Sequence, residues 1–185
     1  MKFDNAHLKN AVLYEIYVRN HGPNGTFDDV TRDLGRIKAL GVDIIWLMPI
    51  HPIGIKNKKG TLGCPYSIQD YRDVNPEYGT LYDFKKLLEE AHQRDLKVMI
   101  DVVYNHTACD SVLVEQHPAF FHQDEHGKPI TTVPAWSDVI DLQHPNTDLQ
   151  EFLIDSLCYW VKMGVDGFRC DVASIVPLSF WLKAR

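Results

Sequence analysis

Residues 147–172 read TDLQEFLIDSLCYWVKMGVDGFRCDV, an amphipathic segment followed by a glycine and a short apolar run. In the first part, apolar side chains recur at the 3.6-residue period of an α-helix, and they are Leu149, Phe152, Leu153, Leu157, Trp160 and Val161. Gly164 stands where this helix must stop. The run from Val165 to Val172 that follows is predicted to be a strand.

The same alternation of helix and strand runs through the rest of the chain. Residues 12–18, 42–50 and 96–104 are apolar runs rich in Val, Ile, Tyr and Trp, which favour strands. Two further segments between them have helical apolar faces, made of Val30, Leu34, Ile37 and Leu40 and of Phe84, Leu87, Leu88 and Ala91. Near-continuous apolar strands between helices predict a parallel α/β sheet covered by helices.

Each predicted helix opens with a capping signature, a Thr followed three residues later by an Asp or Gln. The pairs are Thr26 with Asp29, Thr80 with Asp83, and Thr147 with Gln150. We therefore expect the three helices to begin at these Thr residues. Gly41 marks the end of the first helix, as Gly164 marks the end of the third.

Two connections are unusually long, residues 51–79 and residues 107–146. Both follow a strand and precede a helix. In α/β barrels and open α/β sheets, binding sites are built on that side of the sheet. Long connections of this kind are usually functional, so we expect a site there.

Composition excludes several classes of protein. The 185 residues are 45% hydrophobic and 24% charged, which excludes a disordered or collagen-like chain. The net charge of −6 and the scattered Lys and Arg predict no nucleic-acid partner. No apolar run approaches the roughly 18 residues that span a bilayer, so we expect no membrane partner. Residues 1–10 lack the apolar core of a secretory signal.

Cysteine usage indicates the compartment. The four cysteines, at positions 64, 109, 158 and 170, show neither a C-x-x-C motif nor paired spacing. We expect free thiols in a reducing cytoplasm rather than disulfides or a zinc site.

Charged side chains interrupt two of the apolar strands. Asp101 lies within the third strand, and burying a lone carboxylate is costly unless it has a cation, hydrogen-bond donors or access to a cleft. Arg169 and Asp171 alternate along the fourth strand and so share one face. An Arg beside an Asp holds the carboxylate ionised and oriented, which suits a nucleophile. A structural ion pair of Arg169 with Asp101 or Asp171 is the alternative for either pair taken alone.

Histidines and loop aromatics carry weaker signals. His106 follows the third strand and is either a buried, hydrogen-bonded histidine or a metal ligand, although no second His stands at ligand spacing. His51 and His144 receive no role. The aromatic residues of the second long connection are interpreted as loop packing rather than as a sugar platform, and they are Phe120, Phe121 and Trp136.

Four segments of the chain resemble the α-amylase family of retaining glycoside hydrolases, whose fold is a (β/α)8 barrel. The segments are DVVYNH (101–106), GFRCDVA (167–173), GCPYSIQDY with NPEYGT (63–71 and 75–80) and DVIDL (138–142). The resemblance runs from about residue 12 to the last residues. It implies that the chain is the first four βα units of a TIM barrel with a short insertion after the third strand.

The resemblance also implies roles for individual residues. Asp171 is similar to the nucleophile that forms a covalent glycosyl-enzyme, and Arg169 to the residue that orients it. Asp101 and His106 correspond to residues that hold the sugar at the cleaved bond, and Tyr66 to one that stacks on that sugar. The implied substrates are α-linked glucans and maltooligosaccharides, with hydrolysis and glucosyl transfer both open.

A metal is implied only at one position. Asn105 matches a residue that often binds a structural calcium in this family. The insertion after the third strand is short, and no Asp-x-Asn-x-Asp loop follows the first strand. We therefore expect no cofactor, with calcium at Asn105 as the alternative.

The general acid of the family is not matched by these residues. A retaining glycosidase needs two carboxylates about 5 Å apart. In the family the acid is a Glu at the end of strand five, and none of the glutamates here lies in that motif. We thus expect residues 1–185 to be the N-terminal part of a catalytic barrel that includes the insertion at 107–146. The remainder of the barrel and any C-terminal domain are then absent from these residues, and we expect them to be inactive alone. The alternative is a non-catalytic carbohydrate-binding or partner half-barrel. Unpaired strand edges also predict self-association.

Overall fold

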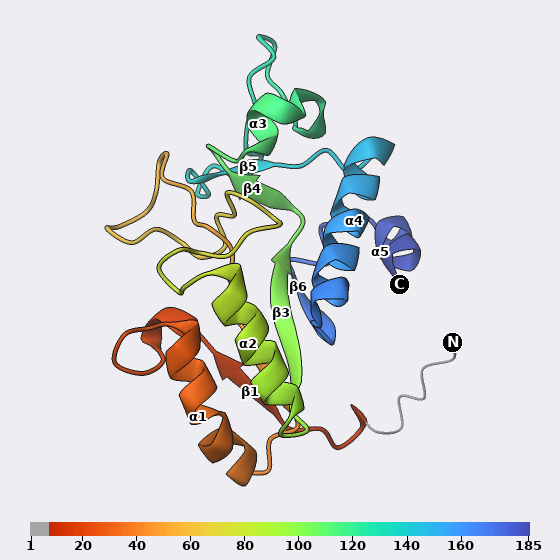
Figure 1. Cartoon of the computed structure of the whole chain (residues 1–185). Coiled ribbons are helices and arrows are strands. Elements are labelled where there is room, and N and C mark those ends of the chain that lie inside the picture. Colours follow the sequence, from red (N-terminus) through yellow and green to blue (C-terminus); the bar gives the residue numbers. More distant parts are fainter. Residues whose placement is uncertain (1–7) are drawn as a thin grey trace.

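The computed structural model describes residues 8–185, and its main sheet has four parallel strands (Figure 1). The strand order is β1-β2-β3-β6, formed by β1 (Leu13–Ile16), β2 (Ile44–Leu47), β3 (Lys97–Val103) and β6 (Gly167–Asp171). Three helices connect them, α1 (Phe27–Ala39), α2 (Leu81–His92) and α4 (Thr147–Met163). The predicted alternation of strands and helices and the parallel sheet are confirmed.

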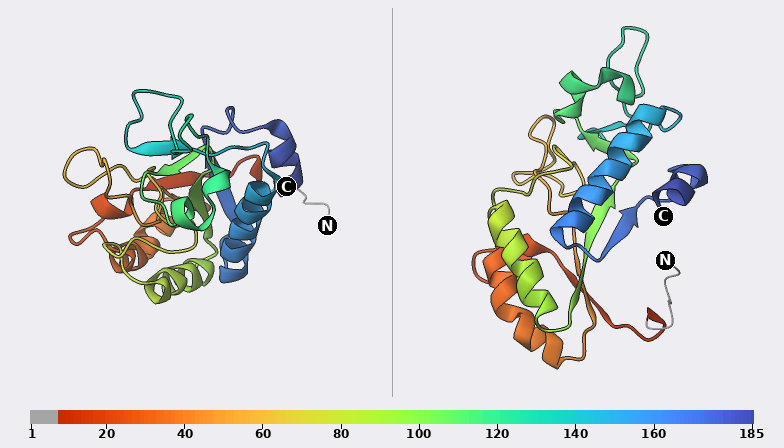
Figure 2. Two further views of the ribbon diagram at one scale, coloured as in Figure 1. Left: turned by 90° about the horizontal axis from the view of Figure 1, so that it is seen from above. Right: turned by 45° about the vertical axis from the view of Figure 1, so that its right-hand side comes forward.

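The three connecting helices cover one face of the sheet, as the two views of Figure 2 show. Side chains that point to this face are almost fully buried, and they include Ile45, Leu47, Val98, Ile100 and Val102. The opposite face carries half-buried side chains such as Trp46, Met99 and Arg169. The apolar core therefore lies between the sheet and the helices, and the open face is where polar groups gather.

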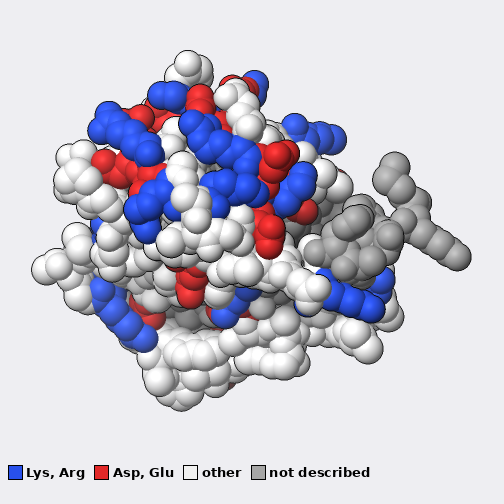
Figure 3. All heavy atoms as spheres, turned by 90° about the horizontal axis from the view of Figure 1, so that it is seen from below, with Lys and Arg blue, Asp and Glu red and all other residues white. Residues whose placement is uncertain are grey.

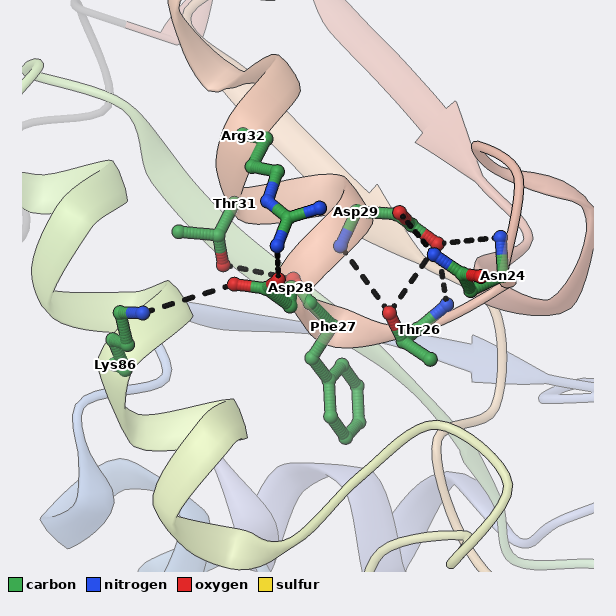
Figure 4. A network of polar contacts seen from close by, with 8 residues as sticks. All are labelled: Asn24, Thr26, Phe27, Asp28, Asp29, Thr31, Arg32 and Lys86. Atoms are coloured by element: carbon green, nitrogen blue, oxygen red, sulfur yellow. Dashed lines mark hydrogen bonds and ion pairs between the residues drawn. The ribbon is translucent and has the colours of Figure 1, made fainter.

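The first turn of α1 is fixed by the predicted capping box (Figure 4). The Thr26 side chain accepts a hydrogen bond from the Asp29 amide at 3.3 Å, and the Asp29 carboxylate accepts one from the Thr26 amide. Asp28 pairs with Arg32 one turn further on and with Lys86 of α2. The start of α1 is thus capped and tied to α2. A second box, between Thr80 and Asp83, caps α2 as predicted.

The predicted cap of α4 is wrong by one residue. Asn146, not Thr147, is the N-cap, and its side-chain oxygen accepts hydrogen bonds from the Asp148 and Leu149 amides at 2.9 and 3.1 Å. Gln150 does not complete a capping box, because its side-chain amide donates to the His144 carbonyl at 2.6 Å. The short Asn side chain reaches the same free amides that Thr147 was expected to satisfy.

Two side chains predicted on the apolar helix faces are not buried, while the predicted end of α4 is confirmed. Leu40 and Val161 belong to the periodic apolar sets but are 60% and 54% exposed. Leu40 is the C-cap residue of α1 and lies beyond the stripe that packs on the sheet. Gly164 ends α4 as expected, with a φ of +117° that a side chain would strain.

The two long connections lie together beyond the carboxyl ends of the strands. Residues 107–146 contain α3 (Leu113–Gln116), the 3-10 turn η3 (Pro118–Phe120) and β5 (Val139–Asp141), which pairs antiparallel with β4 (His106–Ala108). Residues 51–79 pack against this small sheet. At Gly54 a Cβ would stand 2.4 Å from the Ala108 Cβ, so only glycine allows the approach.

Two shorter elements complete the described structure. The 3-10 turn η2 (Val18–Asn20) follows β1. Helix α5 (Leu178–Ala184) follows β6 and buries Phe180 against Tyr104.

The surface carries both signs of charge. On the face where α1 and α2 end, Lys and Arg lie among Asp and Glu rather than in a separate basic patch (Figure 3). Within residues 8–185, none of the helices combines the length and the apolar character needed to cross a bilayer.

We expect Asn146→Ala to lower the free energy of unfolding by about 1 kcal/mol, because two amides lose their cap. Thr147→Ala is the matched control and should cost less than half as much. Urea unfolding of both variants measures the difference. A larger loss for Thr147→Ala would contradict the assignment of the cap.

We expect residues 1–185, produced alone, to self-associate. Strands β1 and β6 are the edges of the described sheet, and Leu13 of β1 is 50% exposed. Unpaired edges template pairing with other chains. Light scattering should show species larger than the 21.3 kDa monomer, and Leu13→Lys should shift them toward it. A monodisperse monomer with a cooperative melt would contradict this expectation.

Candidate active site

The polar side chains predicted to carry chemistry meet at the carboxyl ends of β3 and β6. Asp101 and Arg169 are register partners on these adjacent parallel strands, so their side chains leave the sheet on the same face. Asp171 lies two residues beyond Arg169 and shares that face. The sheet register therefore brings together three charged groups that come from two separate segments.

Arg169 links the two carboxylates. Its Nη1 donates to Asp101 Oδ1 at 2.9 Å and to Asp171 Oδ1 at 2.8 Å. The guanidinium also lies over the rings of Trp46 and Tyr66, with its central carbon 5.2 and 6.0 Å from their centroids. The carboxylates raise the pKa of Arg169 above its ordinary value against the opposing effect of burial. This cation is thus held in place from several sides.

Asp101 is fully buried, and its surroundings have opposing effects on its pKa. Burial raises the pKa of Asp101 to about 6, while Arg169 and the Tyr66 hydroxyl, which donates to Asp101 Oδ2 at 3.1 Å, oppose the rise. The same contact and burial raise the pKa of Tyr66 well above its usual range. These two partners therefore keep the pKa of Asp101 below the value that burial alone would give it.

Asp171 ends β6 at the edge of a hollow. The hollow measures about 230 Å³ and is lined by Lys59, Cys64, Tyr66, His106, Trp136, Asp138, Val139, Asp171 and Val172. The Asp171 side chain retains 18% exposure. Val172, directly after it, has a φ of +41°, a left-handed conformation that is costly for a β-branched residue. Such strain often marks functional sites, and here the backbone turns sharply beside the exposed carboxylate.

His106 enters the same hollow from β4. Its ring is buried, which lowers its pKa, and the nearby carboxylates of Asp171, Asp141 and Asp138 oppose that shift. Tyr71 fixes the strand end that carries it, because its hydroxyl lies 2.9 Å from the carbonyls of both Val103 and His106 and shares its one proton between them. The histidine is therefore presented to the hollow on a rigid backbone.

Asn105 contacts His106 but faces another hollow. It lines a different hollow with Asp141, and its Nδ2 lies 3.2 Å from His106 Nδ1. Calcium prefers six to eight oxygen ligands. The Asp141 carboxylate already accepts hydrogen bonds from Thr131 and Thr132, and residues 8–185 contain no group of three or more His, Cys, Asp or Glu side chains placed to hold a metal. The expectation of no cofactor, with calcium at Asn105 as its alternative, stays a prediction.

Other histidines and aromatics have structural positions. His51 is buried among Tyr71 and Trp160, and His144 Nε2 lies 2.6 Å from the Tyr104 carbonyl. Burial lowers the pKa of His51 to about 4. Phe120 and Phe121 are buried in the core, as loop packing requires.

Three residues of the site were missed from the sequence. Trp46 lies on the open face of β2, which the strand alternation could have indicated. Trp136 was interpreted as loop packing but lines the hollow. Lys59 gave no signal, because its contacts depend on how the two long connections meet.

The contacts of Arg169 bear on whether its ion pairs are only structural or are part of a functional site. Asp101 is buried with Arg169 as a structural pair would be, yet Arg169 also reaches Asp171 at the hollow. The structure brings Tyr66, Asp101, His106, Arg169 and Asp171 together, and the roles of these residues remain predictions.

Comparisons with known proteins show which family this chain is similar to. The model of the α-amylase catalytic domain matches residues 2–127. The α-amylase MalA of Haloarcula japonica is 32% identical over 95% of this chain and 27% of its own length. The trehalose-6-phosphate hydrolase of Bacillus subtilis is 31% identical over 91% of this chain and 36% of its own length.

Solved structures extend the similarity to the fold. The crystal structure of an α-amylase from Lactobacillus plantarum superposes with a TM-score of 0.93 at 55% identity, covering 96% of this chain and 42% of that one. The crystal structure of the noncanonic maltogenic α-amylase AmyB of Thermotoga neapolitana superposes with a TM-score of 0.90 at 46% identity, covering 96% of this chain and 42% of that one.

The chain therefore spans less than half the length of the relatives it matches, between 27% and 46%. Its four parallel βα units are part of a TIM barrel rather than a separate open sheet. With the catalytic-domain model matching about two thirds of its residues and solved α-amylases sharing its fold, this chain belongs to the α-amylase family.

Proposed function

We propose that this chain supplies the nucleophile side of the active site in a retaining glycoside hydrolase that acts on α-linked glucans. The observation that carries the proposal is the contact of Arg169 Nη1 with Asp171 Oδ1 at 2.8 Å, at the edge of a hollow lined by Tyr66 and His106. An ionised, oriented carboxylate that faces an open hollow is suited to attack a bound sugar.

The reaction would proceed by double displacement. A carboxylate oxygen of Asp171 attacks the anomeric carbon, and the bond from that carbon to the leaving sugar oxygen breaks. The leaving oxygen takes a proton from a general acid. Water, deprotonated by the same group, then attacks the anomeric carbon and releases Asp171, so that the configuration is retained.

The neighbouring residues would position the substrate. At the hollow, Tyr66 offers a ring for stacking and His106 a hydrogen-bonding group. The carboxylate of Asp101, which accepts a hydrogen bond from the Tyr66 hydroxyl, is proposed as a second group that holds the sugar. Arg169 would orient the Asp171 carboxylate and fix which oxygen faces the sugar. Because these groups are held by β3, β6 and Tyr71, little reorganisation is needed on binding.

The general acid is proposed to lie outside residues 1–185. None of the described residues that line the hollow is a glutamate. Loss of a general acid typically costs two to four orders of magnitude in rate. We therefore propose that residues 1–185 alone do not turn over glycosides. A longer protein that contains these residues and the general acid, called the full-length protein below, is proposed to do so.

The names of the relatives support an α-glucoside substrate without choosing one. They include α-amylases, an oligo-1,6-glucosidase of Parageobacillus thermoglucosidasius and an α-1,4-glucan:maltose-1-phosphate maltosyltransferase of Cereibacter sphaeroides. Hydrolysis and glycosyl transfer share the covalent intermediate and differ in what attacks it.

A second candidate is a non-catalytic carbohydrate-binding half-barrel. The absence of a glutamate among the described residues lining the hollow favours it for residues 1–185 taken alone. Binding of maltotetraose without turnover by the full-length protein would support this candidate over the first.

The proposed compartment is the cytoplasm. All four cysteines are free thiols, at positions 64, 109, 158 and 170. Free thiols are typical of a reducing environment, which supports this location.

Asp171→Asn should lower kcat for maltooligosaccharides by on the order of 10³-fold in the full-length protein, because the amide is a poor nucleophile. Turnover assays measure the loss. Asp155→Asn, at an exposed position of α4, is the matched control and should leave kcat unchanged. Equal turnover by the wild type and Asp171→Asn would remove Asp171 from the mechanism.

Arg169→Gln should move the acid limb of the pH profile of kcat/KM upward. The guanidinium opposes the rise of the Asp101 pKa, so its loss leaves a pKa above the present value of about 6, and the carboxyl stays protonated to higher pH. Rate measurements between pH 4 and pH 9 test this shift. An unmoved acid limb would contradict the expectation that Asp101, held by Arg169, sets this limb.

A further inference from the structure

Trp136 stands apart from the other aromatics of the second long connection. Phe120 and Phe121 are buried in the core, whereas Trp136 is only partly buried and is not among the half-buried side chains that pack against that core in the described residues. Its ring centroid lies 5.2 Å from that of His106, with the planes tilted by 56°. It lines the same hollow as Tyr66 and Asp171.

Lys59 ties the segment that carries Trp136 to the other long connection. Its Nζ donates to the Ala135 carbonyl at 2.8 Å and pairs with Asp138 Oδ1 at 3.0 Å. These contacts lie on both sides of Trp136 in the sequence. Asp138 is buried, and its carbonyl accepts a hydrogen bond from the Ser67 hydroxyl at 2.9 Å, next to Tyr66. The two connections are therefore fastened to each other beside the hollow.

The segment is also held at its beginning and within its own turn. The Thr132 amide donates to Asp141 Oδ2 at 2.7 Å. Inside the segment, the Trp136 amide donates to the Val133 carbonyl at 2.9 Å. A large aromatic ring on a fixed backbone is a preorganised contact surface, because little conformational entropy remains to be lost when it binds.

We propose that Trp136 contacts a pyranose ring of the glucan substrate in the hollow that Asp171 borders, and that Lys59 is its positioning residue. The apolar C–H face of a pyranose packs on an aromatic ring, and Trp offers the largest such ring together with an N–H donor. This inference rests on the proposed function and adds a residue from the insertion that contributes to substrate specificity.

The test uses the full-length protein and maltotetraose. Trp136→Ala should raise KM about tenfold with kcat changed less than about threefold, because the contact is made in both ground and transition states. Trp136→Phe, which keeps a ring, should recover part of the loss and also serves if the alanine variant fails to fold. Circular dichroism melts monitor folding of every variant.

Lys59 is tested by its coupling to Trp136. Lys59→Met should raise KM, while Lys58→Met, at the neighbouring exposed position, should not. If Lys59 acts through Trp136, the double variant Lys59→Met with Trp136→Ala should be no worse than Trp136→Ala alone. Losses that add in full would overturn the positioning role.

The outcomes separate this inference from the proposed function. Active wild-type protein with an unchanged KM in the folded Trp136→Ala variant would overturn the contact while leaving the glycosidase proposal intact. Wild-type protein that neither binds nor cleaves any α-glucan would overturn the proposed function, and this inference with it.

Discussion

The guanidinium of Arg169 lies between two carboxylates, and much of the arrangement around it follows from that contact. Asp101 is fully buried, so it needs a cation within hydrogen-bond distance. That cation comes from β6, which requires β3 and β6 to be adjacent, parallel and in the register that pairs Asp101 with Arg169. The same register sets Asp171 at the open end of the sheet, where its carboxylate keeps some exposure.

The two long connections turn this end of the sheet into a hollow. Residues 51–79 bring Tyr66 to Asp101, and they are anchored by Tyr71, whose hydroxyl bonds to the end of β3 and the start of β4. Residues 107–146 bring Trp136 to the other side, and Lys59 joins the two connections. Both connections lack long regular elements, so their order depends on these side-chain contacts to backbone carbonyls.

Local signals succeeded where one short range of the chain decides the outcome. The pairs Thr26 with Asp29 and Thr80 with Asp83 cap their helices as expected, because the hydrogen bonds involve residues three apart. The third pair failed because Asn146 offers a competing oxygen one residue earlier. Leu40 and Val161 satisfied the helical period yet remain exposed, since period alone does not tell which side chains other elements cover.

The sequence alone determined the alternation of the four main strands with their helices, the parallel sheet and the family resemblance, and that resemblance grouped Tyr66 with Asp101, His106, Arg169 and Asp171. The alternation follows from periodicity and the resemblance from short motifs, and both are local properties of the chain. Only the tertiary structure decided that Trp136 faces the hollow, that Lys59 fastens its segment, and that Asn105 lines a separate hollow. Those facts depend on how two irregular connections pack against each other, and hydrogen bonds between residues more than 70 positions apart leave no local pattern in the sequence.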